Sequence, residues 1–352
     1  MTYLDDLAAL RAADPGGMLE TVVGLPAQCR QAYAVGLATS RLPESDGIAS
    51  IAVCGRGGSG IAGDVLAAVA APRLRIPVTV VRTPELPEFC GPHTLLVASS
   101  YSGGTSETLG LFEAAVVRGC RILSITSGGT LGARSAQLGV GRVLIPQGLM
   151  PRAAFGYLAL GSLGALEAMG IAPSHADDVD EAAGLMDEVI AESGPDAPAP
   201  GNPAKALALA IGERVPVVWG AEGIASVAAM RWKAQFNENA KVPAFAAALP
   251  ELDHNEVVGW SPGRGDGFAV IALRHAGEHG DVATRFPLSE EIARRSGADV
   301  HEVEGRGRSD LARLLTLVQV GDLVSTYLGL SRGVDPSPVE AITSLKRALA
   351  ET

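Results

Sequence analysis

The sequence predicts an α/β protein of two lobes, each a mainly parallel, doubly wound sheet flanked by helices. Three observations favour this fold class. From residue 48 onward, short apolar, β-rich runs alternate with helical stretches, which is typical of parallel sheets. A segment dense in proline and glycine, residues 193–204, interrupts the pattern and predicts a linker. Beyond it the alternation restarts, so a second, similar lobe is expected, with a cleft between the two.

Residues 1–45 are predicted to be a helical lead-in that packs on the first lobe. Leu4, Leu7 and Leu10 fall on one side of a first helical segment. A Pro-Gly-Gly triplet breaks that segment, and a second amphipathic segment follows at 18–37.

The first lobe, residues 46–192, is predicted from five apolar runs and a long helical region at 153–191. The strand candidates are Ile51–Cys54, Val78–Arg82, Leu95–Ser99, Arg121–Thr126 and Arg142–Pro146. Residues 153–166 carry no charge, but they are fewer than the ~20 residues that a membrane-spanning helix needs. Their many small side chains favour a tightly packed buried helix.

The second lobe, residues 205–352, resembles the first in the order of its elements, without obvious identity of sequence. Its predicted strands are Val215–Gly220, Val242–Ala247, Phe268–Leu273 and Asp299–Val303. Its predicted helices are Ala204–Gly212, Ile224–Asn239, a stretch around Ser289–Ser296 and the segment from the last strand to the C-terminus.

The composition is that of an acidic protein with a large core. The chain has 352 residues, of which 47% are hydrophobic, enough for one large or two ordinary domains. A net charge of −11 argues against nucleic acid and anionic membrane surfaces as partners. A phosphorylated substrate would need local positive groups, because the overall field repels it.

The cysteines indicate a reducing compartment. All four lie far apart, without Cys-x-x-Cys spacing, and are predicted to be free thiols: Cys29, Cys54, Cys90 and Cys120. Asp5 and Asp6 stand where a signal peptide would carry an apolar core. A soluble, cytoplasmic protein is therefore expected.

A glycine-rich stretch, residues 55–63, follows the first predicted strand. Its glycines allow a sharp turn and a close approach of the backbone to a ligand. The helical pattern begins at Ile61, so the turn leads to a helix N-terminus, whose unpaired amide groups and partial positive charge bind phosphate well. Ser59 adds a hydroxyl donor. The stretch therefore predicts an anion-binding cradle.

A dinucleotide site is the alternative interpretation of this stretch, since Gly55, Gly57 and Gly60 also satisfy the Gly-x-Gly-x-x-Gly fingerprint. That alternative expects an acid at the end of the next strand, where this sequence has an arginine and a threonine. A second hydroxyl-rich loop, residues 99–108, also lies between an apolar strand and a helix. Two such loops can converge on one phosphate, so a phosphate site is favoured.

Several motifs together carry a family resemblance. They are Gly57–Asp64, Ser100–Thr105, Glu251–Val257, Gly333–Pro336 and Leu345-Lys346. With them the chain, from about residue 45 to its end, resembles the sugar isomerase (SIS) fold and, more narrowly, the bifunctional phosphoglucose/phosphomannose isomerase family. The resemblance implies two SIS-type lobes, a homodimer, no metal and no other cofactor. It also implies interconversion of a six-carbon aldose phosphate with its ketose phosphate.

The resemblance assigns roles to matching positions. Glu238 matches the base that moves a proton between C1 and C2 through a cis-enediol, and Arg152 matches the residue that stabilises the enediolate. His254 matches the ring-opening histidine, contributed across the dimer, and Lys346 matches a lysine near the ring oxygen. The positions that match the phosphate cradle are Gly57, Gly58, Ser59, Ser100, Ser102 and Thr105.

Each position also has a purely structural interpretation. Glu238 could be a solvated acid at a helix end, and His254 a loop histidine pinned by its acidic neighbours. Arg152 opens the predicted buried helix, where a cation opposes the helix dipole; a salt bridge or a bound oxyanion would offset this. Lys346 suits the dipole near the end of the last helix. The serines and threonines could cap helices, which is compatible with phosphate binding.

Two residues depart from the family pattern: Arg56 stands where a small or apolar residue is common, and Gly104 where asparagine is common. Either change could alter which sugar fits. Two other functions therefore stay open, a phosphosugar-binding protein without turnover and an isomerase of a different sugar phosphate. The leading prediction is interconversion of glucose-6-phosphate, and also mannose-6-phosphate, with fructose-6-phosphate.

Overall fold

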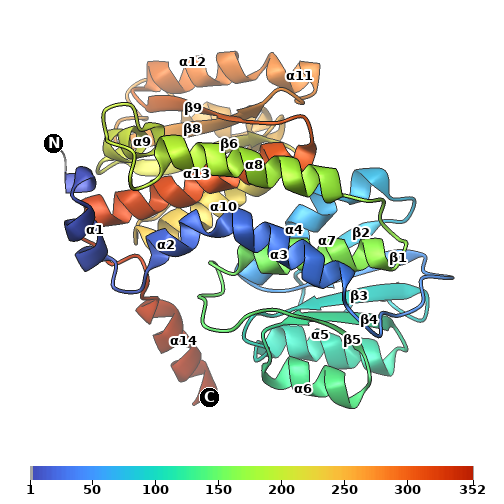
Figure 1. The fold of residues 1–352 in the computed structure, drawn as a ribbon. Coiled ribbons are helices and arrows are strands. Elements are labelled where there is room, and N and C mark those ends of the chain that lie inside the picture. Colours follow the sequence, from blue (N-terminus) through green and yellow to red (C-terminus); the bar gives the residue numbers. More distant parts are fainter. Residues whose placement is uncertain (1–2, 352) are drawn as a thin grey trace. The chain divides into compact units, whose positions relative to one another are not determined.

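The computed structural model describes residues 3–351, which divide into two compact units, each with one parallel sheet (Figure 1). The first-sheet unit contains residues 24–187 and 306–316, and the second-sheet unit contains residues 3–23, 188–305 and 317–351. The predicted fold class, two parallel sheets flanked by helices, is confirmed. Neither unit is one continuous stretch of chain, and the predicted domain boundaries stay a prediction.

The first sheet has five parallel strands in the order β2-β1-β3-β4-β5. They are β1 (Ser50–Cys54), β2 (Val78–Val81), β3 (Thr94–Ser99), β4 (Arg121–Thr126) and β5 (Gly141–Leu144). The central strands read as nearly unbroken apolar runs because both of their faces are buried. The direction in which strands are added reverses between β1 and β3. In doubly wound sheets, ligands bind at such a switch point, beyond the carboxyl ends of the strands.

Helices cover both faces of this sheet. Figure 1 shows α5 and α6 together on one face, and α3 and α7 on the other. The helices of the unit are α3 (Leu25–Leu37), α4 (Gly58–Val69), η2 (Ala71–Arg73), α5 (Ser106–Val117), α6 (Gly129–Gln137) and α7 (Phe155–Ala168). A further helix, α8 (Ala176–Ser193), contributes residues to both units.

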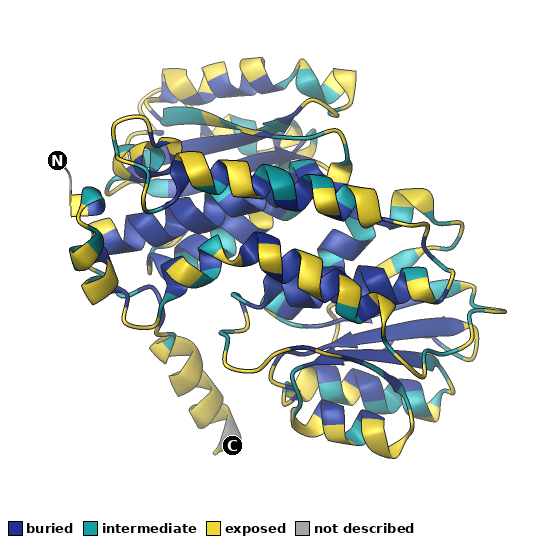
Figure 2. Cartoon of the chain, in the orientation of Figure 1, coloured by how far each residue is buried: buried dark blue, intermediate teal, exposed yellow. Residues whose placement is uncertain are grey.

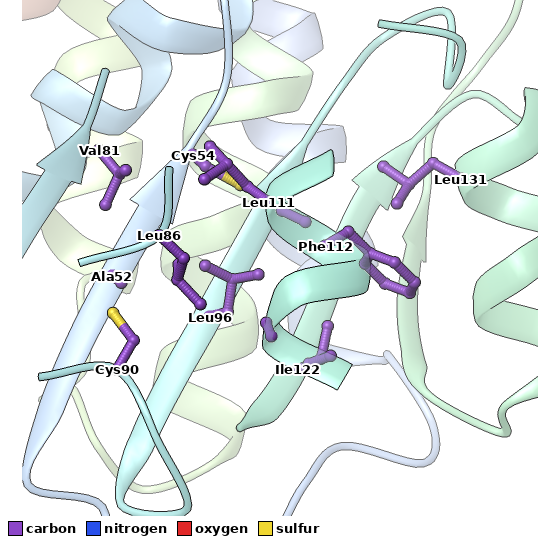
Figure 3. Close-up of a cluster of buried hydrophobic side chains, with 12 residues drawn as sticks. Ala52, Cys54, Val81, Leu86, Cys90, Leu96, Leu111, Phe112, Ile122 and Leu131 are labelled. Carbon is purple, nitrogen blue, oxygen red and sulfur yellow. The ribbon is translucent and has the colours of Figure 1, made fainter. Parts of the chain in front are cut away.

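Apolar side chains from strands, loops, α5 and α6 form a buried cluster in this unit (Figure 3). Its members are Ala52, Cys54, Val81, Leu86, Cys90, Leu96, Ala98, Leu111, Phe112, Ala115, Ile122 and Leu131. Burial raises the pKa of the Cys54 thiol to about 12, so this side chain stays protonated and packs as a small apolar group. All four cysteines are free, as predicted, with Cys120 half-buried.

The second sheet has four parallel strands in the order β7-β6-β8-β9. They are β6 (Val215–Ala221), β7 (Phe245–Leu249), β8 (Phe268–His275) and β9 (Asp299–Gly305). The helices are η1 (Tyr3–Asp5), α1 (Leu7–Ala13), α2 (Met18–Val23), α9 (Pro203–Ile211), α10 (Ile224–Asn239), η3 (Glu251–His254), η4 (Glu256–Gly259), α11 (Gly280–Ala283), α12 (Phe286–Ser296), α13 (Asp310–Ser331, shared with the first-sheet unit) and α14 (Glu340–Ala350).

A buried polar network fixes α10 against α13. The Arg231 guanidinium pairs with the Asp322 carboxylate at 2.6 Å, and both side chains are almost fully buried. Gln235 Nε2 donates to the same carboxylate at 2.9 Å. One turn later, Asn239 Nδ2 donates to Ser325 Oγ at 3.1 Å. Because Arg231, Gln235 and Asn239 are four residues apart, they lie on one face of α10 and set its rotation about its axis.

Several predicted elements differ from the structure. The segment predicted at 18–37 is two helices, α2 and α3. Two further differences follow from the backbone. The strand predicted at 242–247 begins three residues later, at Phe245, because Lys241 takes a left-handed conformation (φ 57°) and turns the chain after α10. The helical region predicted at 153–191 is two helices, α7 and α8. Gly170 (φ 69°) ends the first, and Pro173 follows in the connection.

The predicted linker is held in place by two buried polar side chains. Lys205 Nζ donates to the carbonyls of Pro195 at 3.0 Å and Ala197 at 2.8 Å. Asn202 Nδ2 donates to Gly194 O at 3.1 Å, while its Oδ1 accepts from Lys205 N and caps α9. The proline and glycine residues therefore form an ordered turn-rich segment rather than a flexible tether.

Helix α13 is long and apolar enough to cross a membrane by length and composition alone. However, 89% of its most apolar window is buried inside the protein. Figure 2 shows it as a mainly buried helix, which is how a core helix of a globular protein behaves.

Candidate active site

The carboxyl edge of the first sheet places the two predicted loops side by side. β1 and β3 are adjacent parallel strands, paired from Ser50 with Thr94 to Cys54 with Ala98. The loop after β1 leads into α4 and the loop after β3 leads into α5. Both helix N-termini therefore lie at the switch point, where their first-turn amide groups are oriented toward the same space.

The loop after β1 turns at Gly57, whose φ of 55° favours glycine, and α4 begins at Gly58. Ser59 lies in the first turn of α4 and is buried. Its Oγ accepts a hydrogen bond from Tyr101 N at 3.3 Å, which ties this loop to the next. Within residues 3–351 no side chain caps α4, so capping does not account for Ser59.

The loop after β3 is rich in hydroxyl groups. The Ser100 and Thr105 hydroxyls lie 3.1 Å apart, and Ser102 Oγ accepts from Gly104 N at 3.3 Å. Thr105 is the N-cap residue of α5, but among the described residues no side chain caps that helix. Ser100 is buried and Ser102 exposed, so the loop presents hydroxyls both from its floor and from its rim.

A third loop, residues 127–129 after β4, supports the second loop, and sequence reasoning missed it. Ser127 donates from both its amide and its hydroxyl to Tyr101 O, the hydroxyl at 2.7 Å. A Cβ on Gly103 would lie 1.9 Å from Gly128 O, so these two backbones are in close contact. The signal was present in the sequence, because a Ser-Gly-Gly-Thr run follows this strand as well.

Arg152 lies next to the first turn of α4. A Cβ on Gly58 would come within 2.7 Å of Pro151 O and 3.1 Å of Arg152 Cα, so only a glycine allows this approach. Arg152 is 3% exposed. The helix predicted to open with it begins instead at Phe155, because residues 151–154 form turns. Arg152 therefore lies outside the helix, and its backbone is in close contact with the first turn of α4.

The structure shows what surrounds Arg56 and Gly104, the two residues that depart from the family pattern. The Arg56 guanidinium donates to three main-chain carbonyls at 3.3 Å, those of Gly55, Val81 and Thr83. Arg56 thus ties the loop to the end of β2. Gly104 is exposed, and a Cβ there would have only Ser102 Oγ nearby, at 4.0 Å.

Glu238 belongs to the second-sheet unit and lies in the last turn of α10, half-buried. It lines a pocket of about 390 Å³ in that unit. The other lining residues are Asn237, Lys241, Asp335, Pro338, Val339, Glu340, Ala341 and Ile342. The pocket thus lies between the end of α10 and the segment that begins α14.

His254 ends the short helix η3 and is exposed. Its neighbour Asp253 accepts hydrogen bonds from Arg285 Nη1 at 3.1 Å and from Ser289 Oγ at 2.7 Å, at the start of α12. These contacts anchor the loop and leave the imidazole facing solvent in this chain.

Lys346 lies on α14, whose residues from Glu340 to Leu349 are all exposed (Figure 2). It shares the second-sheet unit with Glu238 and His254, whereas Arg152 and the phosphate loops belong to the first-sheet unit. The cradle and Arg152 therefore belong to one unit, and Glu238, His254 and Lys346 belong to the other.

The family model and the two relatives described below are all phosphoglucose isomerases by name. The family described as "Bacterial phospho-glucose isomerase C-terminal SIS domain" matches residues 201–349. A bifunctional phosphoglucose/phosphomannose isomerase of Caldicellulosiruptor bescii is 35% identical over 95% of this chain and 99% of its own length. The enzyme of that name from Thermoplasma acidophilum is 36% identical over 86% of this chain and 90% of its own.

Solved structures show the same fold at low identity. The C-terminal domain of glucosamine-fructose-6-phosphate aminotransferase from Francisella tularensis matches 90% of this chain and 96% of its own with a TM-score of 0.69 and 13% identity.

Proposed function

Because the chain belongs to the bifunctional phosphoglucose/phosphomannose isomerase family, we propose that it interconverts glucose-6-phosphate, and also mannose-6-phosphate, with fructose-6-phosphate. The observation that carries this proposal is the cradle at the switch point of the first sheet. There two hydroxyl-rich loops, two helix N-termini and Arg152 gather, in a protein whose net charge of −11 otherwise repels anions. A phosphate group is the part shared by all three sugars.

The chemistry follows from the side chains. Isomerisation moves one proton between C1 and C2 and passes through a cis-enediol, so it needs a base that reaches both carbons. We assign this role to Glu238, which lines the pocket at the end of α10. Arg152 stabilises the negative charge that develops on the enediolate oxygen. His254 and Lys346 transfer protons during ring opening and closing.

A substrate panel tests the activity. Given fructose-6-phosphate, the protein is expected to form both glucose-6-phosphate and mannose-6-phosphate, because an enediol can be protonated on either face. In D₂O, NMR is expected to show deuterium at C1 or C2 of the product. Pentose, heptose and amino-sugar phosphates serve as controls. If calorimetry instead detects binding of glucose-6-phosphate, mannose-6-phosphate or fructose-6-phosphate and no turnover is found, the chain is a phosphosugar-binding protein.

We further propose a homodimer in which His254 completes the active site of the partner subunit. His254 is exposed in the single chain, and apolar side chains are exposed near it in sequence: Val258 at 76% and Phe245, on edge strand β7, at 57%. Contiguous apolar patches mark protein interfaces, and both side chains would contribute to such a patch in the proposed dimer. A soluble, cytoplasmic enzyme is proposed, with a sugar phosphate as its small-molecule partner.

Complementation tests the shared site. Glu238→Gln and His254→Asn variants are each expected to be inactive alone. Co-expressed, they should recover about a quarter of wild-type activity, because half of the dimers are mixed and one of the two sites in each is intact. If His254 served its own subunit, every site would carry one substitution and no activity would return.

A further inference from the structure

Lys241 has an unusual backbone conformation beside the proposed base. α10 ends at Asn239 with Ala240 as its C-cap, and Lys241 follows with φ 57°. Helices often end in this left-handed conformation, but glycine usually supplies it, because a Cβ makes it unfavourable. Among residues 3–351, Arg41 and Lys241 are the non-glycine residues with positive φ. A lysine here therefore calls for an explanation in its side chain.

The side chain joins two distant segments of the second-sheet unit. Lys241 Nζ donates to Glu238 O, in the last turn of α10, and to Pro336 O at 2.9 Å, 95 residues further along the chain. The first contact satisfies a helix-end carbonyl and places a positive charge where the helix dipole favours it. The second contact reaches the buried Pro336, just ahead of α14.

This bridge joins the two segments that line the pocket of Glu238. One wall comes from the end of α10, at Asn237, Glu238 and Lys241, and the other from residues 335–342. Helix α14 is exposed along the described residues 340–349, so little packing of its own fixes its direction. The position of residues 335–342 then depends on contacts such as the one from Lys241 to Pro336.

We propose that Lys241 is a positioning residue: it holds residues 335–342 against the end of α10 and so sets the pocket around Glu238 and the start of the helix that carries Lys346. This inference rests on the proposed function. It does not place Lys241 in contact with the sugar. It accounts for a lysine at a position where glycine would be the less strained residue.

Lys241→Gly tests this role, because glycine relieves the backbone conformation while removing the bridge. kcat is expected to fall about 10- to 100-fold, the effect of a slightly displaced catalytic group. KM is expected to change little, because the phosphate cradle lies in the other unit. Hydrogen exchange of residues 335–342 is expected to become faster. Lys241→Arg keeps the charge and the donors, so its kcat and its hydrogen exchange at residues 335–342 should be close to those of the wild type. Lys241→Asn replaces the glycine variant if that variant does not fold.

The possible results distinguish a failure of the Lys241 bridge from a failure of the proposed isomerase activity. Slower turnover together with faster exchange supports the bridge. Unchanged kcat overturns it, whatever the exchange shows, since a purely structural lysine would give that result. A fall in kcat with unchanged exchange also overturns it, because Lys241 would then act without residues 335–342. If the wild-type protein isomerises none of the sugars, the proposed function fails, while unchanged exchange in Lys241→Gly would still refute the bridge.

Discussion

Replacing Glu238 by glutamine is expected to lower kcat by about 10²- to 10⁴-fold, the range attributed to a positioned general base. The amide has nearly the same shape as the carboxylate, but it cannot take a proton from carbon. The position is half-buried in the last turn of α10, so the fold should tolerate the change. KM is expected to change far less than kcat, because phosphate binding belongs to the other unit.

Glu340→Gln provides a matched control for this prediction. Glu340 is a carboxylate that lines the same pocket, from the first residue of α14. If Glu238 is the base, Glu340→Gln retains kcat within a few-fold while Glu238→Gln does not. Deuterium uptake in D₂O should disappear only in Glu238→Gln. Equal losses in both variants would show that the pocket needs negative charge in general, and full activity of Glu238→Gln would remove it as the base.

The parts of the fold that the sequence predicted are those in which local pattern and burial agree. The apolar runs of β1, β3 and β4 are buried on both faces, so hydrophobicity alone located them. The cradle was predictable for a similar reason, since strand, glycine turn and helix N-terminus follow one another within about 15 residues. Long-range arrangements carried no such signal.

Two examples show where local pattern fails. Nothing near residue 306 predicts that residues 306–316 join the first-sheet unit. They do so because Glu181, on α8, accepts hydrogen bonds from the Arg308 and Ser309 amides at 2.9 and 3.1 Å. Although burial opposes it, these bonds lower the pKa of Glu181 to about 2. The late start of β7 also has no signal in the sequence, because a lysine rather than a glycine takes the left-handed conformation.

In the candidate site too, local sequence identified some residues and not others. Ser59 and Ser102 were found from the loops themselves. Arg152 is far from α4 in sequence, and its approach depends on Gly58 having no side chain. Only the family resemblance pointed to it before the structure did. The same is true of His254 and Lys346, which are exposed in the single chain and have no burial pattern that would single them out.

Two adjacent glycines in the phosphate loop are expected to respond differently to alanine, the first with a large loss of stability and the second with almost none. Gly103 has φ 66°, and a Cβ there would lie 1.9 Å from Gly128 O and 2.8 Å from Gly128 C. Both are backbone atoms of the neighbouring loop, so relief requires moving one loop away from the other. Gly103→Ala is therefore expected to lower the free energy of unfolding by roughly 2–4 kcal/mol, from the left-handed conformation and the collision together.

Gly104→Ala is the matched variant, one residue along. Its φ lies outside the left-handed range, and Ser102 Oγ is the nearest neighbour of the added Cβ, at 4.0 Å. Its free energy of unfolding should stay within about 0.5 kcal/mol of wild type. Urea denaturation measures both values, and KM for fructose-6-phosphate is expected to rise only in Gly103→Ala, since Ser102 and Thr105 move with the loop. Equal stability of the two variants would mean that the loops after β3 and β4 do not touch, and the cradle would then lack the support that positions its hydroxyls.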